Sequence, residues 1–89
     1  MTKIRIEKTR EKKLKKLKVS TWPVWECEPS SFDWEYDSNE SCYILEGEAR
    51  VETPEGSVSF GKGDFVVFPK GMKCRWKVLQ KIKKHYKFD

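Results

Sequence analysis

The stretch at residues 32–48, F-D-W-E-Y-D-S-N-E-S-C-Y-I-L-E-G-E, predicts two consecutive strands of a β-barrel. Its first half alternates aromatic with acidic side chains, so three rings share one face of an extended chain and three carboxylates share the other. After the turn signal Asp37-Ser38-Asn39, the run at 42–45 is apolar at every position, which predicts a strand covered on both faces. The stretch therefore indicates a sheet whose inner face is aromatic.

Turn signals recur along the chain after residue 19. They are Glu28-Pro29-Ser30, Asp37-Ser38-Asn39, Glu46-Gly47, Thr53-Pro54-Glu55-Gly56, Gly61-Lys62-Gly63-Asp64 and Pro69-Lys70-Gly71. Short runs rich in Trp, Tyr, Phe, Val and Ile lie between them, and a spacing of about 8 to 12 residues is typical of an all-β sandwich or barrel. The apolar run at 65–68 resembles the run at 42–45, so we expect both of its faces to be covered as well.

The C-terminal part of the chain continues the strand alternation. One face carries Cys74, Trp76 and Val78 against Lys73, Arg75 and Lys77, and further along Lys84, Tyr86 and Phe88 oppose Lys83, His85 and Lys87. These patterns predict two more segments with distinct faces.

The first 18 residues have a different residue pattern. K-I-R-I-E at 3–7 alternates as a strand does, and the Lys-rich run that follows places Leu14 and Leu17 three residues apart. This spacing predicts a short helix with a narrow apolar stripe and with Thr9 as its N-cap. At 89 residues the chain is expected to be one domain, with the N-terminal strand and helix at 1–18 and the barrel at 19–89.

Two motifs give the fold a family resemblance. E-S-C-Y-I-L-E-G at 40–47 resembles the second half of the first cupin motif, and G-D-F-V-V-F-P-K-G-M-K-C at 63–74 resembles the second cupin motif. The resemblance implies an all-β cupin, a double-stranded β-helix or jelly-roll barrel. More narrowly, W-P-V-W-E-C-E-P, F-D-W-E-Y and the ending R-W-K-V-L-Q-K-I-K-K-H-Y-K-F are similar to the small cupin family named after the ureidoglycine aminohydrolase domain. That similarity runs from Leu14 to Phe88 and points to stand-alone bacterial members, including hyperthermophile ones, of unassigned function.

The resemblance also bears on metal binding. Metal-binding cupins hold a divalent ion with two His and a Glu from the first motif and a His from the second. These positions correspond to Trp34, Tyr36, Glu40 and Cys74 in this chain. Only Glu40 and Cys74 remain as ligands, a hard oxygen and a soft sulfur, so we expect no bound metal and no other cofactor. A metal-dependent enzyme of the ureidoglycine aminohydrolase type, for which the resemblance implies manganese, is the alternative.

The same positions predict a pocket for a small-molecule ligand. Its expected wall is Trp34, Tyr36, Cys74 and Trp76, with Glu40 at the polar end. Alternatively, the rings simply fill the barrel. An enzyme built on this pocket would use Glu40 and Cys74 as acid, base or nucleophile.

The single histidine has two interpretations. His85 follows the Lys-rich part of the last segment, and it lies on the face opposite Tyr86 and Phe88. It is either an exposed or rim side chain or, if it points inward, an acid–base partner of Glu40.

Charge is unevenly placed along the chain. Residues 1–18 hold nine Lys/Arg against two Glu and residues 73–88 hold seven Lys/Arg without an acid, whereas residues 19–72 hold three basic and eleven acidic residues. The basic ends either find counter-charges on the barrel or mark a basic β-barrel that binds nucleic acid. Because the aromatic residues at 32–36 are interleaved with acids that repel phosphate, we expect no nucleic-acid partner.

Composition sets the remaining expectations. No apolar run approaches the ~20 residues of a membrane span, and the Lys-rich start lacks the apolar region of a signal peptide, so we expect a cytoplasmic protein without a membrane partner. Three cysteines without a C-x-x-C pair predict reduced thiols. A high Lys and Glu content suits a thermophilic source. The strand at 3–7 could pair with the sheet of a neighbour, which predicts a homodimer.

Overall fold

The structure, a computed structural model, describes residues 4–8 and 11–88. Its elements are β1 (Arg5–Lys8), α1 (Glu11–Leu17), the 3-10 helix η1 (Val19–Thr21), β2 (Val24–Cys27), β3 (Ser30–Glu35), β4 (Glu40–Thr53), β5 (Gly56–Gly61), β6 (Asp64–Phe68) and β7 (Lys73–Phe88). The predicted all-β class with one short N-terminal α-helix is confirmed. The predicted N-cap, Thr9, lies outside the described residues.

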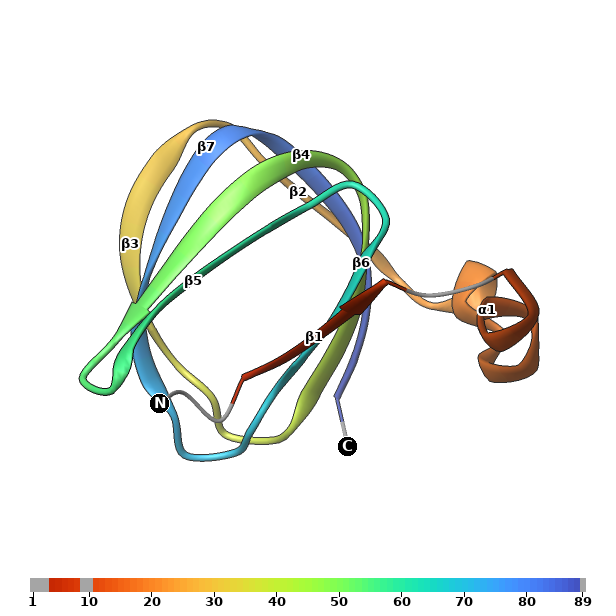
Figure 1. Ribbon diagram of the computed structural model, residues 1–89, viewed down its shortest axis with the longest axis horizontal. Helices are drawn as coiled ribbons and strands as arrows, with labels where there is room; N and C mark the ends of the chain where they lie inside the picture. The colour runs from red at the N-terminus through yellow and green to blue at the C-terminus, as the bar shows by residue number, and fades with distance from the viewer. Residues whose placement is uncertain (1–3, 9–10, 89) are drawn as a thin grey trace.

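Two long strands, β4 and β7, organise the barrel. They pair antiparallel from Glu40 opposite Phe88 to Glu52 opposite Arg75. Shorter strands pair with the other edge of each long strand. On β4 these are β6 and β5, and on β7 they are β2 and β3. β1 pairs with the outer edge of β6. The sheet curves back on itself as an open barrel, with α1 standing outside it (Figure 1).

One predicted turn is wrong. Glu46-Gly47 does not end a strand, because β4 continues through it and keeps its pairing with β7 on both sides. The register shifts here instead, and Gly47 has φ 91°. A Cβ at this position would lie 2.1 Å from the carbonyl oxygen of Lys81, so the two strands approach too closely for any side chain. The glycine therefore marks a bulge that bends the sheet.

The core is aromatic, as the alternation predicts. Tyr36 stacks on Phe68 with ring centroids 4.8 Å apart, and Phe60 meets Trp76 edge-on at 5.4 Å. Cys74, Trp76 and Val78 are buried, whereas Lys73 and Arg75 on the other face are exposed. The inner faces of 42–45 and 65–68 are buried as expected. On their outer faces Tyr43, Leu45 and Val67 are only partly buried, whereas Phe65 is buried against Trp22 and lies under the ammonium of Lys13.

The basic ends of the chain find acidic partners on the barrel. Lys8 pairs with Asp64 at 2.7 Å, and among the described residues the outer face of β7 contributes three further ion pairs. These are Arg75–Asp33, Lys77–Glu52 and Lys81–Glu28. The uneven charge along the sequence is thus partly balanced by ion pairs between segments. Among the helices described, none has the length and apolar character needed to cross a membrane.

Candidate functional site

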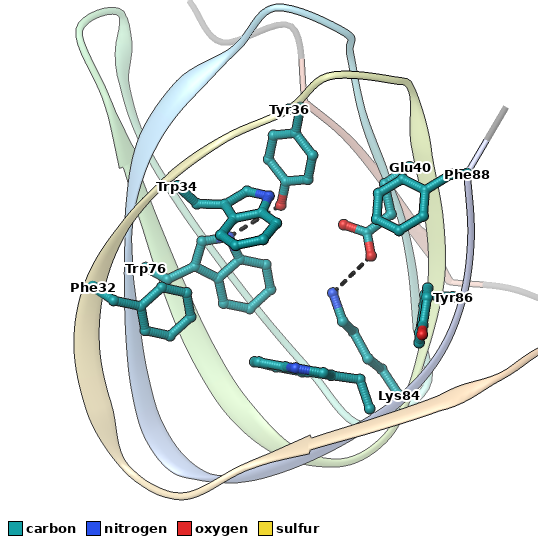
Figure 2. Close-up of a pocket in the computed structure, with 9 residues that line it drawn as sticks. Phe32, Trp34, Tyr36, Glu40, Trp76, Lys84, Tyr86 and Phe88 are labelled. Atoms are coloured by element: carbon teal, nitrogen blue, oxygen red, sulfur yellow. Dashed lines mark hydrogen bonds and ion pairs between the residues drawn. The ribbon is translucent and has the colours of Figure 1, made fainter.

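A cavity of about 260 Å³ opens inside the barrel (Figure 2). Strands β2, β3, β4 and β7 supply its wall together with Tyr36, which directly follows β3. The lining residues are Trp25, Phe32, Trp34, Tyr36, Glu40, Trp76, Lys84, Tyr86 and Phe88. Seven of these nine side chains are aromatic, and the other two carry opposite charges. The cavity is therefore an apolar space with one concentrated polar feature.

That polar feature is a buried ion pair. Nζ of Lys84 lies 3.0 Å from Oε2 of Glu40, and the two side chains are 6% and 5% exposed. The ammonium also sits 5.0 Å from the ring centroid of Trp25 and 4.7 Å from that of Trp76. Ring faces attract a desolvated cation, which offsets part of what burial of the charge costs. The lysine is thus fixed by one carboxylate and two indole rings.

Strand register explains how a lysine comes to lie inside. Lys84 is opposite Trp25 in the β2–β7 ladder, and Phe32 is opposite Trp76 in the β3–β7 ladder. Phe32 and Trp76 stack with an interplanar angle of 5° and centroids 6.1 Å apart. Because side chains two apart share a face, Trp76, Lys84 and Tyr86 all point inward from β7.

Glu40 presents its second oxygen to the cavity. Among the described residues only Lys84 bonds the carboxylate, and it does so through Oε2. Oε1 accepts no hydrogen bond from them, although the side chain is almost completely buried. Figure 2 shows the carboxylate pointing into the pocket. Buried polar atoms are normally hydrogen-bonded, so Oε1 is the atom at which a ligand gains most by donating.

Tyr36 provides a complementary group. Its hydroxyl oxygen accepts a hydrogen bond of 3.0 Å from Nε1 of Trp76, and its own hydrogen has no acceptor among the described residues. Burial, with a smaller contribution from the negative charge of Glu40, raises the pKa of the Tyr36 phenol well above its usual range; the hydrogen bond from Trp76 opposes this. The phenol therefore stays protonated and can donate. Backbone bonds to Met72 and Gly71 hold this residue in place.

The mouth of the cavity is lined by half-exposed rings. Trp34 and Phe88 line the pocket and yet are each 48% exposed. Trp34 meets Tyr36 edge-on at 6.4 Å, and Phe88 meets Tyr86 at 5.7 Å. Large exposed rings around a concave site are typical of a surface that a ligand covers.

The residues of this pocket do not fit a divalent metal ion. The two positions at which metal cupins place imidazoles hold the indole of Trp34 and the protonated phenol of Tyr36. The carboxylate of Glu40 is bound to an ammonium rather than free to bind a metal. Within residues 4–8 and 11–88, no three His, Cys, Asp or Glu side chains come together as a metal-binding group. The charge that balances Glu40 is supplied by the chain itself.

The structure brings together four of the predicted pocket residues, namely Trp34, Tyr36, Glu40 and Trp76. Cys74 does not join them: its side chain is buried in the core, and it borders a separate open depression with Asp33 and Glu35. Burial, followed by the nearby charges of Glu40 and Asp33, raises the pKa of the Cys74 thiol to about 11. A thiol in this state is a poor nucleophile at neutral pH.

His85 also lies away from the pocket. It occupies the face of β7 opposite Lys84 and Tyr86, and its Nδ1 is 3.0 Å from the carbonyl oxygen of Trp22. The expected alternative in which it points inward to Glu40 is wrong, because Lys84 occupies that place.

Several pocket residues were missed by sequence reasoning: Trp25, Phe32, Lys84, Tyr86 and Phe88. A signal for Lys84 was present, since the alternation places it on one face with Tyr86 and Phe88. Lys84 was nevertheless not predicted to be buried, because most lysines in such runs are exposed to solvent.

Comparisons with known proteins agree with this architecture. A DUF861 family protein from Thermotoga maritima is 53% identical over 98% of this chain and 100% of its own, with a TM-score of 0.95. The EutQ protein of Clostridium difficile is 25% identical over 71% of this chain, with a TM-score of 0.66; the matched region spans 50% of that protein. A cupin-2 domain protein from Shewanella frigidimarina shares the fold, at 19% identity over 74% of this chain and 67% of its own and with a TM-score of 0.62. No curated protein matches.

The predicted cupin fold is therefore confirmed. Residues 14–86, most of the barrel together with the end of α1, match the family described as the EutQ-like cupin domain. The chain belongs to the EutQ-like cupin domain family.

Proposed function

We propose that this cupin domain binds a small, neutral, planar molecule in the aromatic pocket, with a polar hydrogen of the ligand directed at Oε1 of Glu40. The observation that carries the proposal is that this oxygen is buried, faces a cavity and has no partner among the described residues. A bound hydroxyl or N–H group would satisfy it. The hydroxyl of Tyr36 would donate to an acceptor atom on the same ligand.

Charge balance supports a neutral ligand. The carboxylate of Glu40 and the ammonium of Lys84 cancel within the cavity wall. An anionic ligand would meet the carboxylate, and a cationic one would meet the ammonium, each in a site with little water to screen the repulsion. A neutral molecule with a donor next to an acceptor avoids both penalties.

Shape supports a planar body of modest size. The cavity of about 260 Å³ lies just below the range of roughly 300 to 1,000 Å³ that is usual for drug-sized ligands. Its walls are ring faces and edges, including the half-exposed Trp34 and Phe88 at the mouth. Flat apolar ligands gain most from stacking against such walls.

Metal-dependent catalysis of the ureidoglycine aminohydrolase type is less well supported, because Trp34 and Tyr36 cannot replace imidazole ligands. The ion pairs on the outer face of β7 likewise give no support for nucleic-acid binding, since three of the basic side chains on that face already have carboxylate partners.

Indole NMR signals offer a direct test. Trp25, Trp34 and Trp76 line the pocket, whereas Trp22 packs against Phe65 outside it. The probe is 2-naphthol, whose single hydroxyl can donate to Glu40 and accept from Tyr36. Titration should shift the indole N–H signals of the three pocket tryptophans and leave that of Trp22 in place.

Two controls make this test specific. Naphthalene, which has the same rings without the hydroxyl, should bind more weakly. Glu40→Gln, which keeps the shape of the side chain but not its charge, should weaken 2-naphthol binding about tenfold or more, because hydrogen bonds to charged groups are worth about 1.5 to 3 kcal/mol. Absence of any shift at saturating 2-naphthol, or equal shifts at all four indoles, would argue against the pocket as a binding site.

A further inference from the structure

We propose that the pocket catalyses proton transfer at a carbon next to a carbonyl group, with Glu40 as the base and the hydroxyl of Tyr36 as the donor to the carbonyl oxygen. This inference rests on the proposed function, because the substrate must first occupy the same cavity. The substrate class is small cyclic or aromatic ketones with an acidic α C–H bond.

Glu40 has the properties of a carbon base. Its free oxygen faces an apolar cavity, and its other oxygen is held by Lys84 at 3.0 Å. The side chain is 5% exposed, so little water competes with substrate for Oε1. A carboxylate that is fixed in place and shielded from water needs little reorganisation to accept a proton.

Tyr36 has the properties of an oxyanion donor. Its oxygen already accepts a hydrogen bond from Nε1 of Trp76, which polarises the hydroxyl and leaves its hydrogen directed elsewhere. The ring is fixed by stacking on Phe68 with an interplanar angle of 9°. A preorganised donor of this kind stabilises negative charge as it develops on a substrate oxygen.

The two groups face the same space from different sides. Figure 2 shows the Tyr36 hydroxyl and the Glu40 carboxylate both directed into the pocket. Both residues line the cavity, and the negative charge of Glu40 contributes to the raised pKa of the Tyr36 phenol. A base and a neutral donor in one apolar cavity is the arrangement that α-proton transfer requires.

The reaction balances without a cofactor. Oε1 of Glu40 takes the α proton as the C–H bond breaks, and the electron pair moves into the enolate, whose oxygen accepts the hydrogen bond from Tyr36. Protonated Glu40 then returns the proton to the same carbon, or to a conjugated carbon, and the carbonyl re-forms. The pocket opens to solvent beside the half-exposed Trp34 and Phe88, so the carboxyl proton of Glu40 can exchange with water before it is returned. Return to the same carbon after that exchange replaces the α hydrogen by one from solvent, and return to a conjugated carbon isomerises the substrate.

Hydrogen–deuterium exchange tests this step. The probe is 2-tetralone in D₂O, with loss of the α-proton NMR signals followed with and without protein. Its enol shares the bicyclic skeleton and oxygen position of 2-naphthol, so the binding and exchange tests address one geometry. We expect exchange above the protein-free rate, with Glu40→Gln lowering the protein-dependent part about 100-fold or more and Tyr36→Phe lowering it about tenfold or more.

Matched variants and the indole signals separate the possible outcomes. Lys62→Ala changes an exposed residue outside the pocket and should exchange as the wild type does. Unfolding midpoints establish that each variant is folded. If 2-tetralone shifts the pocket indoles but exchange stays at the protein-free rate, or if exchange survives in Glu40→Gln, proton transfer at this site is overturned and binding stands. If neither 2-naphthol nor 2-tetralone shifts the indoles, both proposals fall.

Discussion

Lys84 and Glu40 form a buried ion pair in the wall of an aromatic pocket. The ammonium of Lys84 touches one oxygen of Glu40 and lies against the rings of Trp25 and Trp76. Burying a single unpaired charge here would cost much free energy, and each member of the pair lowers the cost of burying the other. The pair also fixes which carboxylate oxygen faces the cavity, and so it links the stability of the barrel to the chemistry of the site.

Removing one member of the pair should destabilise the protein strongly. Lys84→Met leaves the carboxylate of Glu40 buried without its partner, and we expect a loss of about 3 to 5 kcal/mol in the free energy of unfolding. The double variant Glu40→Gln/Lys84→Met removes both charges and should be more stable than Lys84→Met alone. Urea denaturation of the wild type, both single variants and the double variant measures this, and additive losses would show that the two side chains are not coupled.

The hydrogen bond between Trp76 and Tyr36 should also contribute to stability. Tyr36→Phe keeps the ring but leaves Nε1 of Trp76 buried without its acceptor, which we expect to lower the free energy of unfolding by about 1 to 3 kcal/mol. The change should be smaller when it is made in a Trp76→Phe background, because no indole N–H is then left unsatisfied. An equal loss in both backgrounds would contradict the assigned bond.

Much of the barrel follows from strand alternation, because an inward side chain every second residue is a local property of the backbone. Alternation at 74–78 correctly predicts which face is buried, and at 32–36 it correctly predicts which side chains point into the barrel, although Trp34 at the mouth stays 48% exposed. The turn signal at Glu46-Gly47 is the prediction that fails, since the glycine allows β4 to approach the backbone of β7 instead of ending the strand. That contact joins residues far apart in the sequence, and no local pattern contains it.

The candidate site was only half predictable for the same reason. Trp34, Tyr36, Glu40 and Trp76 lie within or beside the recognisable motifs, whereas Trp25 and Lys84 enter the pocket through pairing between β2 and β7. The partner of Glu40 depends on the order of strands around the barrel. Alternation places Lys84 on the same face as Tyr86 and Phe88, but most lysines in a Lys-rich segment are solvated, so alternation alone does not predict that this one is buried.

Two glycines with similar backbone angles should respond differently to substitution. Gly47→Ala places a Cβ 2.1 Å from the carbonyl oxygen of Lys81 and 2.7 Å from Cα of Ile82, and these backbone atoms cannot move without disturbing the β4–β7 ladder. We expect a loss of about 3 to 5 kcal/mol. Gly63→Ala meets nothing within 4 Å at φ +89°, so only about 1 to 2 kcal/mol of backbone strain is expected. Thermal or urea unfolding compares the two, and equal losses would contradict the close approach at Gly47.

The buried thiol of Cys42 should make the protein less stable in alkali. Burial raises its pKa from 9.0 to about 12, although the nearby charge of Lys84 acts in the opposite direction. Between these two values the unfolded chain has released the proton and the folded protein retains it, so the free energy of unfolding falls as pH rises. This one group contributes a slope of at most about 1.4 kcal/mol per pH unit, and the stabilising contribution present below pH 9 is lost progressively toward pH 12.

Urea denaturation at several pH values should show a shallower decline for Cys42→Val, which has an apolar side chain of similar size that does not titrate. If the two proteins lose stability in parallel above pH 9, the Cys42 thiol does not titrate differently in the folded and unfolded states.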